Sequence, residues 1–220
     1  MTTDFQKARD NMVECQIHTA GVVSPGLLER FKVVPRELFL PEKVRGIAYV
    51  DEIVSFGKGR FLLEPIIHSK LLQAARLVPT DIVLDIGGGT GYSSAILSPL
   101  VMQVVSLDEK KYIEKAARLW EKLGLENILP VEGDMPSGAP EHGPFSLILV
   151  NGAVSEVARA LVNQLSPGGR LLTVVKKPGL GPGEAVIVER LEDGQPSSRV
   201  LFEAGTPYLP GFEPVSSFAF

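Results

Sequence analysis

Apolar and polar positions follow two distinct periods in the second part of the chain, from about residue 81 onward. Short apolar runs predict buried strands, and segments with an apolar residue every three or four positions predict helices. The predicted strands occupy 82–86, 102–107, 127–131, 145–151, 169–176, 185–188 and 217–220. The predicted helices occupy 91–99, 110–123 and 154–165. This alternation is typical of an α/β fold in which a mostly parallel, seven-stranded sheet carries helices on both faces.

The first 76 residues lack this alternation and are rich in helical and turn signals. Ser24-Pro25 predicts a helix start, because Ser caps a helix and Pro fits its first turn. A second helix is expected to begin at Pro65. We therefore expect a single domain over 1–220, with 1–76 as an N-terminal helical, substrate-side extension and 77–220 as the core.

A glycine-rich stretch follows the first predicted strand of the core: Asp85-Ile86-Gly87-Gly88-Gly89-Thr90-Gly91-Tyr92. Gly is needed where φ is positive or where a Cβ would collide with a bound molecule. The helix that follows directs its free N–H groups at the same place. The pattern predicts a nucleotide-like ligand, and the expected contacts are Asp85, Gly87, Gly88, Gly89, Thr90 and Gly91.

Two ligand classes compete for this loop. A dinucleotide site has the pattern G-x-G-x-x-G or G-x-G-x-x-A, and Ser94 stands here in place of the last small residue. A carboxylate at the strand end, Asp85, would repel a pyrophosphate but suits the cationic amino and sulfonium groups of S-adenosylmethionine. We favour S-adenosylmethionine, with S-adenosylhomocysteine as product, over a nicotinamide cofactor or a loop without ligand.

Acidic residues end two further predicted strands. Asp108, followed by Glu109, is placed to accept hydrogen bonds from ribose hydroxyls, and Asp134 is placed to accept one from the adenine amino group. Met135 follows Asp134 and belongs to the same expected site. Ligands of open α/β sheets lie outside the carboxyl ends of the strands, so these acids are expected to surround one cofactor.

Composition narrows the choice of partners. A net charge of −4 and a pI near 5.5 give no support for a nucleic-acid-binding surface, and no 18-residue apolar run predicts a membrane span. A lone cysteine, Cys15, cannot form an internal disulfide, so we expect the chain to be cytoplasmic. Cys15 lies among helix-like residues, where we expect it to be packed. His18 and His142 lack partners at metal-ligand spacing, and no metal is predicted.

Several motifs together resemble the protein-L-isoaspartate O-methyltransferase family, from about residue 8 to residue 175. The glycine-rich loop is shared by many methyltransferases and is weak evidence by itself. The more diagnostic motifs are Val34-Pro35-Arg36-Glu37-Leu38-Phe39-Leu40-Pro41 and Ala48-Tyr49-Val50-Asp51. Further matches are Met12-Val13-Glu14-Cys15-Gln16-Ile17, Gly133-Asp134, Pro144-Phe145 and Gln164-Leu165-Ser166-Pro167-Gly168-Gly169-Arg170-Leu171.

The resemblance implies a Rossmann-like class I methyltransferase fold with an S-adenosylmethionine-binding core over 77–220. It also implies a cytosolic repair enzyme that methylates the free carboxylate of isoaspartyl residues in damaged proteins. Its partners would be peptides or proteins with such residues, not nucleic acid or a membrane, and the expected assembly is a monomer or weak dimer. A carboxylate acceptor is ionised at pH 7, so no general base is required.

The substrate side departs from the family pattern. The family's active-site loop ends in Thr-Ile-Ser-Gln-Pro or a close variant, and Leu63 and Glu64 replace its Ser and Gln here. Leu63 offers no hydroxyl, and Glu64 would repel an incoming carboxylate. Asn151 at a strand tip is a candidate substrate contact, and His68 is a candidate cofactor contact or a helix histidine with a structural role. The alternative is a non-catalytic or re-specialised homologue that binds S-adenosylmethionine and acts on or senses another ligand.

Overall fold

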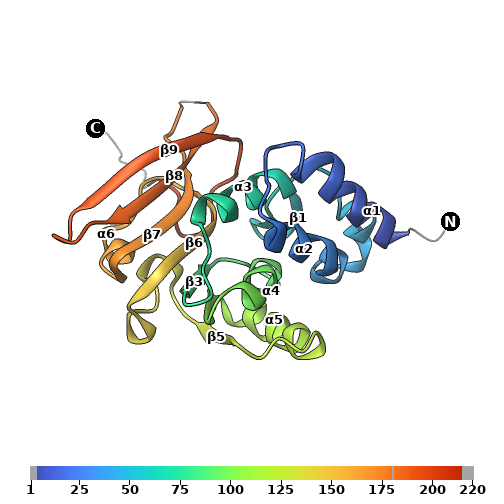
Figure 1. The fold of residues 1–220 in the computed structure, drawn as a ribbon, viewed down its shortest axis with the longest axis horizontal. Coiled ribbons are helices and arrows are strands. Elements are labelled where there is room, and N and C mark those ends of the chain that lie inside the picture. The colour runs from blue at the N-terminus through green and yellow to red at the C-terminus, as the bar shows by residue number, and fades with distance from the viewer. Residues whose placement is uncertain (1–3, 180, 215–220) are drawn as a thin grey trace.

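A seven-stranded sheet forms the centre of the computed structural model, which describes residues 4–179 and 181–214 (Figure 1). The strand order is β5-β4-β3-β6-β7-β8-β9, and the first five strands of this order are parallel to one another. Strand β8 is antiparallel to β7, and β9 is antiparallel to β8. The strands are β3 (Ile82–Ile86), β4 (Gln103–Asp108), β5 (Ile128–Glu132), β6 (Phe145–Val154), β7 (Leu165–Val175), β8 (Gly183–Arg190) and β9 (Pro196–Ala204). The predicted mostly parallel α/β architecture is confirmed.

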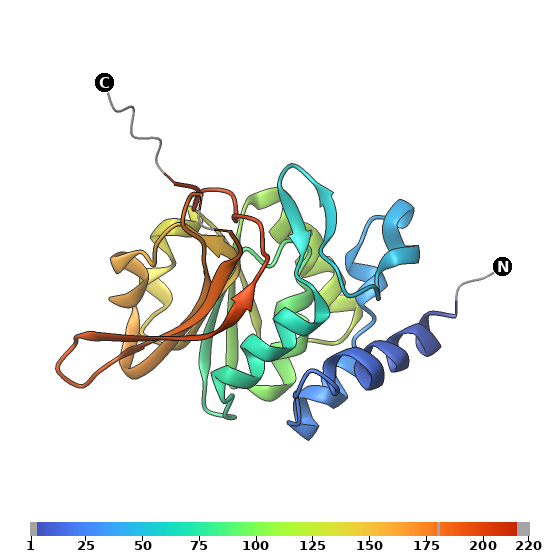
Figure 2. The same ribbon diagram turned by 90° about the horizontal axis from the view of Figure 1, so that it is seen from above.

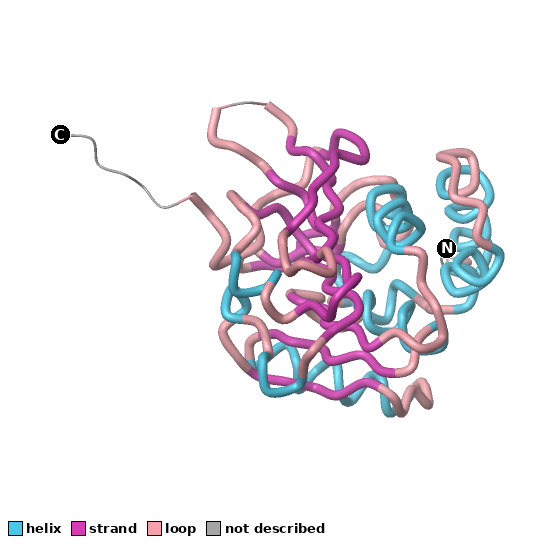
Figure 3. The backbone as a smooth tube through the Cα atoms, turned by 60° about the vertical axis from the view of Figure 1, so that its left-hand side comes forward, coloured by secondary structure: helices cyan, strands magenta, loops and turns pink. Residues whose placement is uncertain are grey.

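Helices lie on both sides of this sheet, as Figure 3 shows. The α-helices are α1 (Phe5–Met12), α2 (Pro25–Val33), α3 (Pro65–Ala75), α4 (Tyr92–Leu97), α5 (Lys110–Lys122) and α6 (Arg159–Val162). A π-helical turn, Val13–Ile17, continues α1, and short 3-10 helices span Arg36–Phe39, Glu42–Ile47, Ser98–Leu100, Met135–Ser137 and Pro140–His142. No helix among the described residues is long and apolar enough to cross a membrane.

The sheet is buried on both faces, as expected for parallel strands covered by helices. Side chains that alternate along β3 and β6 separate into two apolar clusters. The cluster under the N-terminal helices, α3, α4 and α5 includes Val83, Leu147, Leu149 and Trp120, and the cluster on the other face includes Leu84, Ile86, Ile148 and Leu161. Trp120 is only 2% exposed and belongs to the core.

Two sequence-based expectations need correction, and a third falls on residues that the structure does not describe. The predicted helix at 154–165 shrinks to α6, because the segment before it bonds to distant backbone: Ala153 N–H donates to Pro207 C=O at 2.8 Å and Ser155 N–H donates to Phe212 C=O at 2.9 Å. The seventh strand is β9, whereas the predicted strand 217–220 lies outside the described residues. Cys15 is exposed rather than packed.

A short hairpin, absent from the sequence-based prediction, precedes α3. It consists of β1 (Val54–Gly57) and β2 (Arg60–Leu62), paired antiparallel around a turn at Lys58-Gly59. In Figure 2 the hairpin, in cyan, and the chain after β9, in red, stand at the same edge of the molecule. They approach each other, since a Cβ on Gly59 would lie 3.2 Å from the ring of Pro210. This edge is where the glycine-rich loop lies.

A buried arginine explains why the motif around Arg36 is a unit. The Arg36 side chain is fully buried, and its guanidinium donates to the carbonyls of Ala48 and Leu63, at 2.7 Å each. It also lies over the Tyr92 ring, 4.9 Å from the centroid. Arg36 thus joins the segment after α2 to the end of the hairpin and to the first residue of α4.

The neighbouring residue of the motif completes this junction. The carboxylate of Glu37 accepts a hydrogen bond from the Tyr49 hydroxyl and forms an ion pair with Arg9 at 3.2 Å. Burial and the hydrogen bond to Glu37 raise the pKa of Tyr49, so this phenol remains a donor at neutral pH. The two diagnostic motifs therefore contact each other and hold α1 in place within the N-terminal extension.

Replacement of Arg36 by Met should lower the free energy of unfolding by about 2–4 kcal/mol, because two buried carbonyls lose a charged donor. Chemical denaturation of the purified protein measures this change. The matched variant Lys43→Met removes an exposed cation from the same region and should change stability by less than about 0.5 kcal/mol. Equal stabilities of the two variants would contradict the anchoring role of Arg36.

Candidate functional site

The glycine-rich loop joins the carboxyl end of β3 to α4. Its backbone has positive φ at Gly87 (72°), Gly89 (61°) and Gly91 (92°), a conformation that other residues adopt only with strain. The Gly87 N–H donates to the Leu107 carbonyl of β4 at 3.0 Å, which keeps the loop against the strand ends. The predicted requirement for glycine is met by this geometry.

Asp85 is fully buried beneath this loop. Its carboxylate accepts hydrogen bonds from Ser93 Oγ at 2.8 Å, Ser94 Oγ at 2.5 Å and Asn151 Nδ2 at 2.7 Å. Burial raises the pKa of Asp85, and these three donors oppose that rise. The serine that departs from the dinucleotide pattern, Ser94, thus has a defined partner. Asp85 ties β3, α4 and β6 together under the loop.

Four predicted site residues surround one small cavity of about 10 Å³, close to the size of one water molecule. They are Leu63, His68, Gly88 and Asn151, and the lining is completed by Phe61, Leu62, Tyr92 and Ser93. Both amide hydrogens of Asn151 are engaged, with Asp85 and with the Ile86 carbonyl at 2.9 Å. Only the carbonyl oxygen of Asn151 is left for another partner.

His68 is buried in α3, with only 2% of its surface exposed. Its ring packs edge-on against Phe31, at a centroid distance of 5.6 Å, and lies 5.8 Å from the Tyr92 ring. Burial, together with the nearby charge of Arg36, lowers the pKa of His68 to about 3. The imidazole is therefore neutral at pH 7, and its Nε2 has no hydrogen-bond partner among the described residues.

Asp108 ends β4 on the other side of the loop and is also fully buried. Its carboxylate accepts from the Gly89 N–H at 2.8 Å and from the Glu109 N–H at 2.7 Å. The third partner is the guanidinium of Arg60, which comes from β2 and forms a direct ion pair. Burial raises the pKa of Asp108, and the Arg60 charge opposes this rise. The sequence-based prediction named Asp108 but not Arg60.

The other predicted contacts lie around Arg60. Met135 is buried, with its sulfur 3.5 Å from Arg60 Nη1, and the exposed Glu109 is 3.9 Å from the same atom. Asp134 is exposed and uses its carboxylate to cap the turn after it, accepting from Ser137 Oγ at 2.6 Å. The structure therefore groups Asp108, Glu109 and Met135 around one guanidinium, and leaves Asp134 at the rim.

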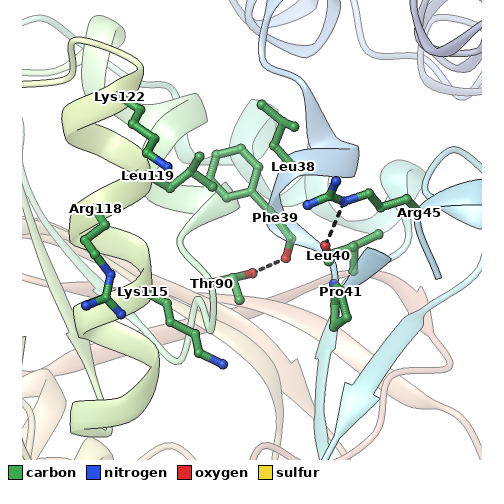
Figure 4. A pocket seen from close by; sticks show the side chains of 10 residues that line it. All are labelled: Leu38, Phe39, Leu40, Pro41, Arg45, Thr90, Lys115, Arg118, Leu119 and Lys122. Carbon is green, nitrogen blue, oxygen red and sulfur yellow. Dashed lines mark hydrogen bonds between the residues drawn. The ribbon is translucent and has the colours of Figure 1, made fainter. Parts of the chain in front are cut away.

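A separate cleft of about 480 Å³ lies on the outer side of the loop, between α5 and the segment from Leu38 to Arg45 (Figure 4). Of the predicted site residues only Thr90 lines it, with its hydroxyl donated to the Phe39 carbonyl. Its floor is apolar, and its lining carries cations but no carboxylate. The cations are Arg45, Lys115, Arg118 and Lys122. Such a rim would repel a cationic ligand, so this cleft is not the site that the acids predict.

A family model matches almost the whole chain. The model is described as protein-L-isoaspartate(D-aspartate) O-methyltransferase (PCMT), and it matches residues 7–207. The chain belongs to this methyltransferase family. The resemblance drawn from the motifs is confirmed, and the match extends beyond β7 to the segment that follows β9.

Relatives in this methyltransferase family resemble most of the chain. The protein-L-isoaspartate O-methyltransferase of Methylorubrum extorquens is 38% identical over 80% of this chain and 77% of its own length. That of Koribacter versatilis is 34% identical over 88% of this chain and 86% of its own length.

Solved structures confirm the expected fold. A protein-L-isoaspartate O-methyltransferase superposes with a TM-score of 0.79 at 28% identity, over 92% of this chain and 66% of that one. A putative Plasmodium falciparum homologue, solved in complex with S-adenosyl-L-homocysteine, gives a TM-score of 0.73 at 18% identity, over 94% and 98% of the two chains.

Protonation of His68 should make the protein acid-sensitive. Its pKa is about 3 in the folded chain and about 6.5 in the unfolded chain, so between these values only the unfolded chain binds the proton. The free energy of unfolding should therefore fall as pH drops, by about 2 kcal/mol from this group at pH 5. Urea denaturation at pH 7.5 and pH 5 measures the free energy of unfolding that is lost on acidification. This loss should be smaller in His68→Gln than in the wild type, by about 2 kcal/mol. The same loss in both proteins would contradict a buried, neutral His68.

Proposed function

We propose that this protein is an S-adenosylmethionine-dependent methyltransferase that esterifies the free carboxylate of isoaspartyl residues in peptides and damaged proteins. Membership in the family over residues 7–207 carries the proposal. The preserved loop with glycines at three positive-φ positions supports it. We place the activity in the cytoplasm, in a monomer or weak dimer that does not bind nucleic acid.

The residues around the loop fit this cofactor in kind. Asp108 is the carboxylate for the ribose hydroxyls, with Glu109 beside it, and Met135 offers an apolar contact for the base. Asp134 at the rim is the acceptor for the adenine amino group. Asp85 acts from beneath: its Oδ2 would lie 3.2 Å from a Cβ on Gly88, so its charge lies one backbone layer from a ligand seated on the loop.

We assign the methyl acceptor to the side of the loop where Leu63 and Asn151 line the small cavity. The bound cofactor supplies an electrophilic methyl group, and an ionised carboxylate needs no base to attack it. The work of the protein is then to hold the acceptor in line and to keep water away, which is worth at best about 7–11 kcal/mol. In this assignment the carbonyl oxygen of Asn151 and the neutral ring of His68 are contacts that orient the acceptor or the cofactor. We assign no proton transfer to them.

A second candidate function has a specific observation in its favour. Leu63 is buried at the position of the family's Ser, and Glu64 follows it. Asp51 accepts a hydrogen bond from the Ile66 N–H, two residues after Glu64, at 3.4 Å. Burial and the neighbouring charges of Asp51 and Glu52 raise the pKa of Glu64, so this end of the hairpin is acidic. An isoaspartyl carboxylate would be repelled there. The second candidate is a homologue that keeps the cofactor and acts on or senses a different ligand.

Methyl transfer from radiolabelled S-adenosylmethionine to a peptide with one isoaspartyl residue tests the leading proposal. The matched control is the same peptide with an ordinary aspartyl residue. We expect base-labile methyl ester on the isoaspartyl peptide alone, because only its carboxylate has the geometry of the family's substrate.

No ester on either peptide, with cofactor binding retained in a calorimetric titration, would contradict the repair activity and favour the second candidate. The Leu63→Ser variant extends the test by restoring the missing hydroxyl. A higher rate of transfer in this variant supports an acceptor site at Leu63, and an unchanged rate speaks against it.

A further inference from the structure

Arg60 and Asp108 form an ion pair that is almost completely removed from solvent, with side chains 1% and 0% exposed. Such a pair is costly to form, because both charges lose their hydration. It persists only where further hydrogen bonds and close packing surround it. The two backbone N–H groups that bond Asp108 satisfy this condition on the acid side.

Aromatic and sulfur contacts enclose the cation of this pair. The Arg60 guanidinium lies over the Tyr112 ring, 4.7 Å from its centroid, and reaches the sulfur of Met135. Phe56, from the other strand of the hairpin, packs edge-on against the same Tyr112 ring at 5.9 Å. The hairpin therefore inserts an aromatic ring and a guanidinium between the loop, β4 and α5.

Side chains of the hairpin and of the segment after β9 fill the space that the glycines leave open. A Cβ on Gly89 would lie 2.6 Å from Phe56, and a Cβ on Gly87 would lie 2.5 Å from Leu209 in the segment after β9. Phe56 and Leu209 thus occupy the space beside these glycines. A ligand seated on the loop would need the same volume.

We propose that Arg60 competes with the cofactor for Asp108 from within the chain, so that the hairpin must withdraw Arg60 before S-adenosylmethionine can bind. This inference rests on the proposed function, since it takes Asp108 as the ribose acceptor. The Arg60 guanidinium pairs with the Asp108 carboxylate at the position where the ribose hydroxyls would bind. Arg60 thereby sets the cofactor affinity of this chain.

The competition has a quantitative consequence. When only the open fraction of a protein binds a ligand, the apparent dissociation constant rises by the inverse of that fraction. Removal of the guanidinium breaks the ion pair with Asp108. This loss favours the open hairpin and frees the carboxylate to bind the ribose hydroxyls. Replacement of Arg60 by a neutral residue should therefore increase the affinity for the cofactor, whereas loss of a residue that binds the cofactor would decrease it.

Calorimetric titration of the full chain with S-adenosylhomocysteine tests this proposal. The Arg60→Gln variant should bind at least about tenfold more tightly than the wild type, as the open fraction rises. The matched control Lys58→Gln removes an exposed cation from the turn of the same hairpin and should bind as the wild type does. Equal or weaker binding by Arg60→Gln, with measurable binding by the wild type, would overturn the competition while leaving the proposed function intact. Absence of binding in both proteins would overturn both.

Kinetics of the wild type keep the test decisive if Arg60→Gln fails to fold. The single tryptophan, Trp120, donates its indole N–H to the Gly91 carbonyl at 2.9 Å, so its fluorescence reports on the loop. In stopped-flow mixing with S-adenosylhomocysteine, the observed rate should level off at high ligand concentration, because hairpin opening becomes limiting. A rate that rises linearly over the whole range would overturn the proposal.

Discussion

The buried carboxylate of Asp108 is the constraint on which the rest of the site depends. A carboxylate without solvent must find a cation or several donors, and an unpaired one would cost about 3–5 kcal/mol. Two backbone N–H groups, at Gly89 and Glu109, satisfy part of this need and at the same time fix the loop beside β4. In the structure the last partner of this carboxylate is Arg60. In the function that we propose, the ribose of the cofactor takes its place.

Two networks of hydrogen bonds place this carboxylate and its competitors. Asp85 joins β3, α4 and β6 under the loop and so forms the floor of the site. Arg36 bonds the carbonyl of Leu63 at the end of the hairpin and so anchors one end of the segment that carries Arg60. The N-terminal motif that contains Arg36 thus contacts the backbone of the hairpin that carries Arg60. Arg60 is therefore carried by a hairpin that is anchored at its Leu63 end.

Local patterns predicted most of the fold, and long-range contacts account for what they missed. The strand at 82–86, the loop and the helix that carries Trp120 follow from period and glycine content within about ten residues. The helix predicted at 154–165 was too long because Ala153 and Ser155 bond to chain more than fifty positions away. The hairpin has strands of only four and three residues, too short for a periodic signal. Arg60 meets Asp108 across 48 positions, so only its place beside the altered family loop could have drawn attention to it.

A crystal structure of the wild-type protein bound to S-adenosylhomocysteine would show directly which group pairs with Asp108. We expect the ribose hydroxyls to lie within hydrogen-bond distance of the Asp108 carboxylate and the Arg60 guanidinium to have left it. A bound ligand beside an intact pair of Arg60 and Asp108 would contradict the proposed competition.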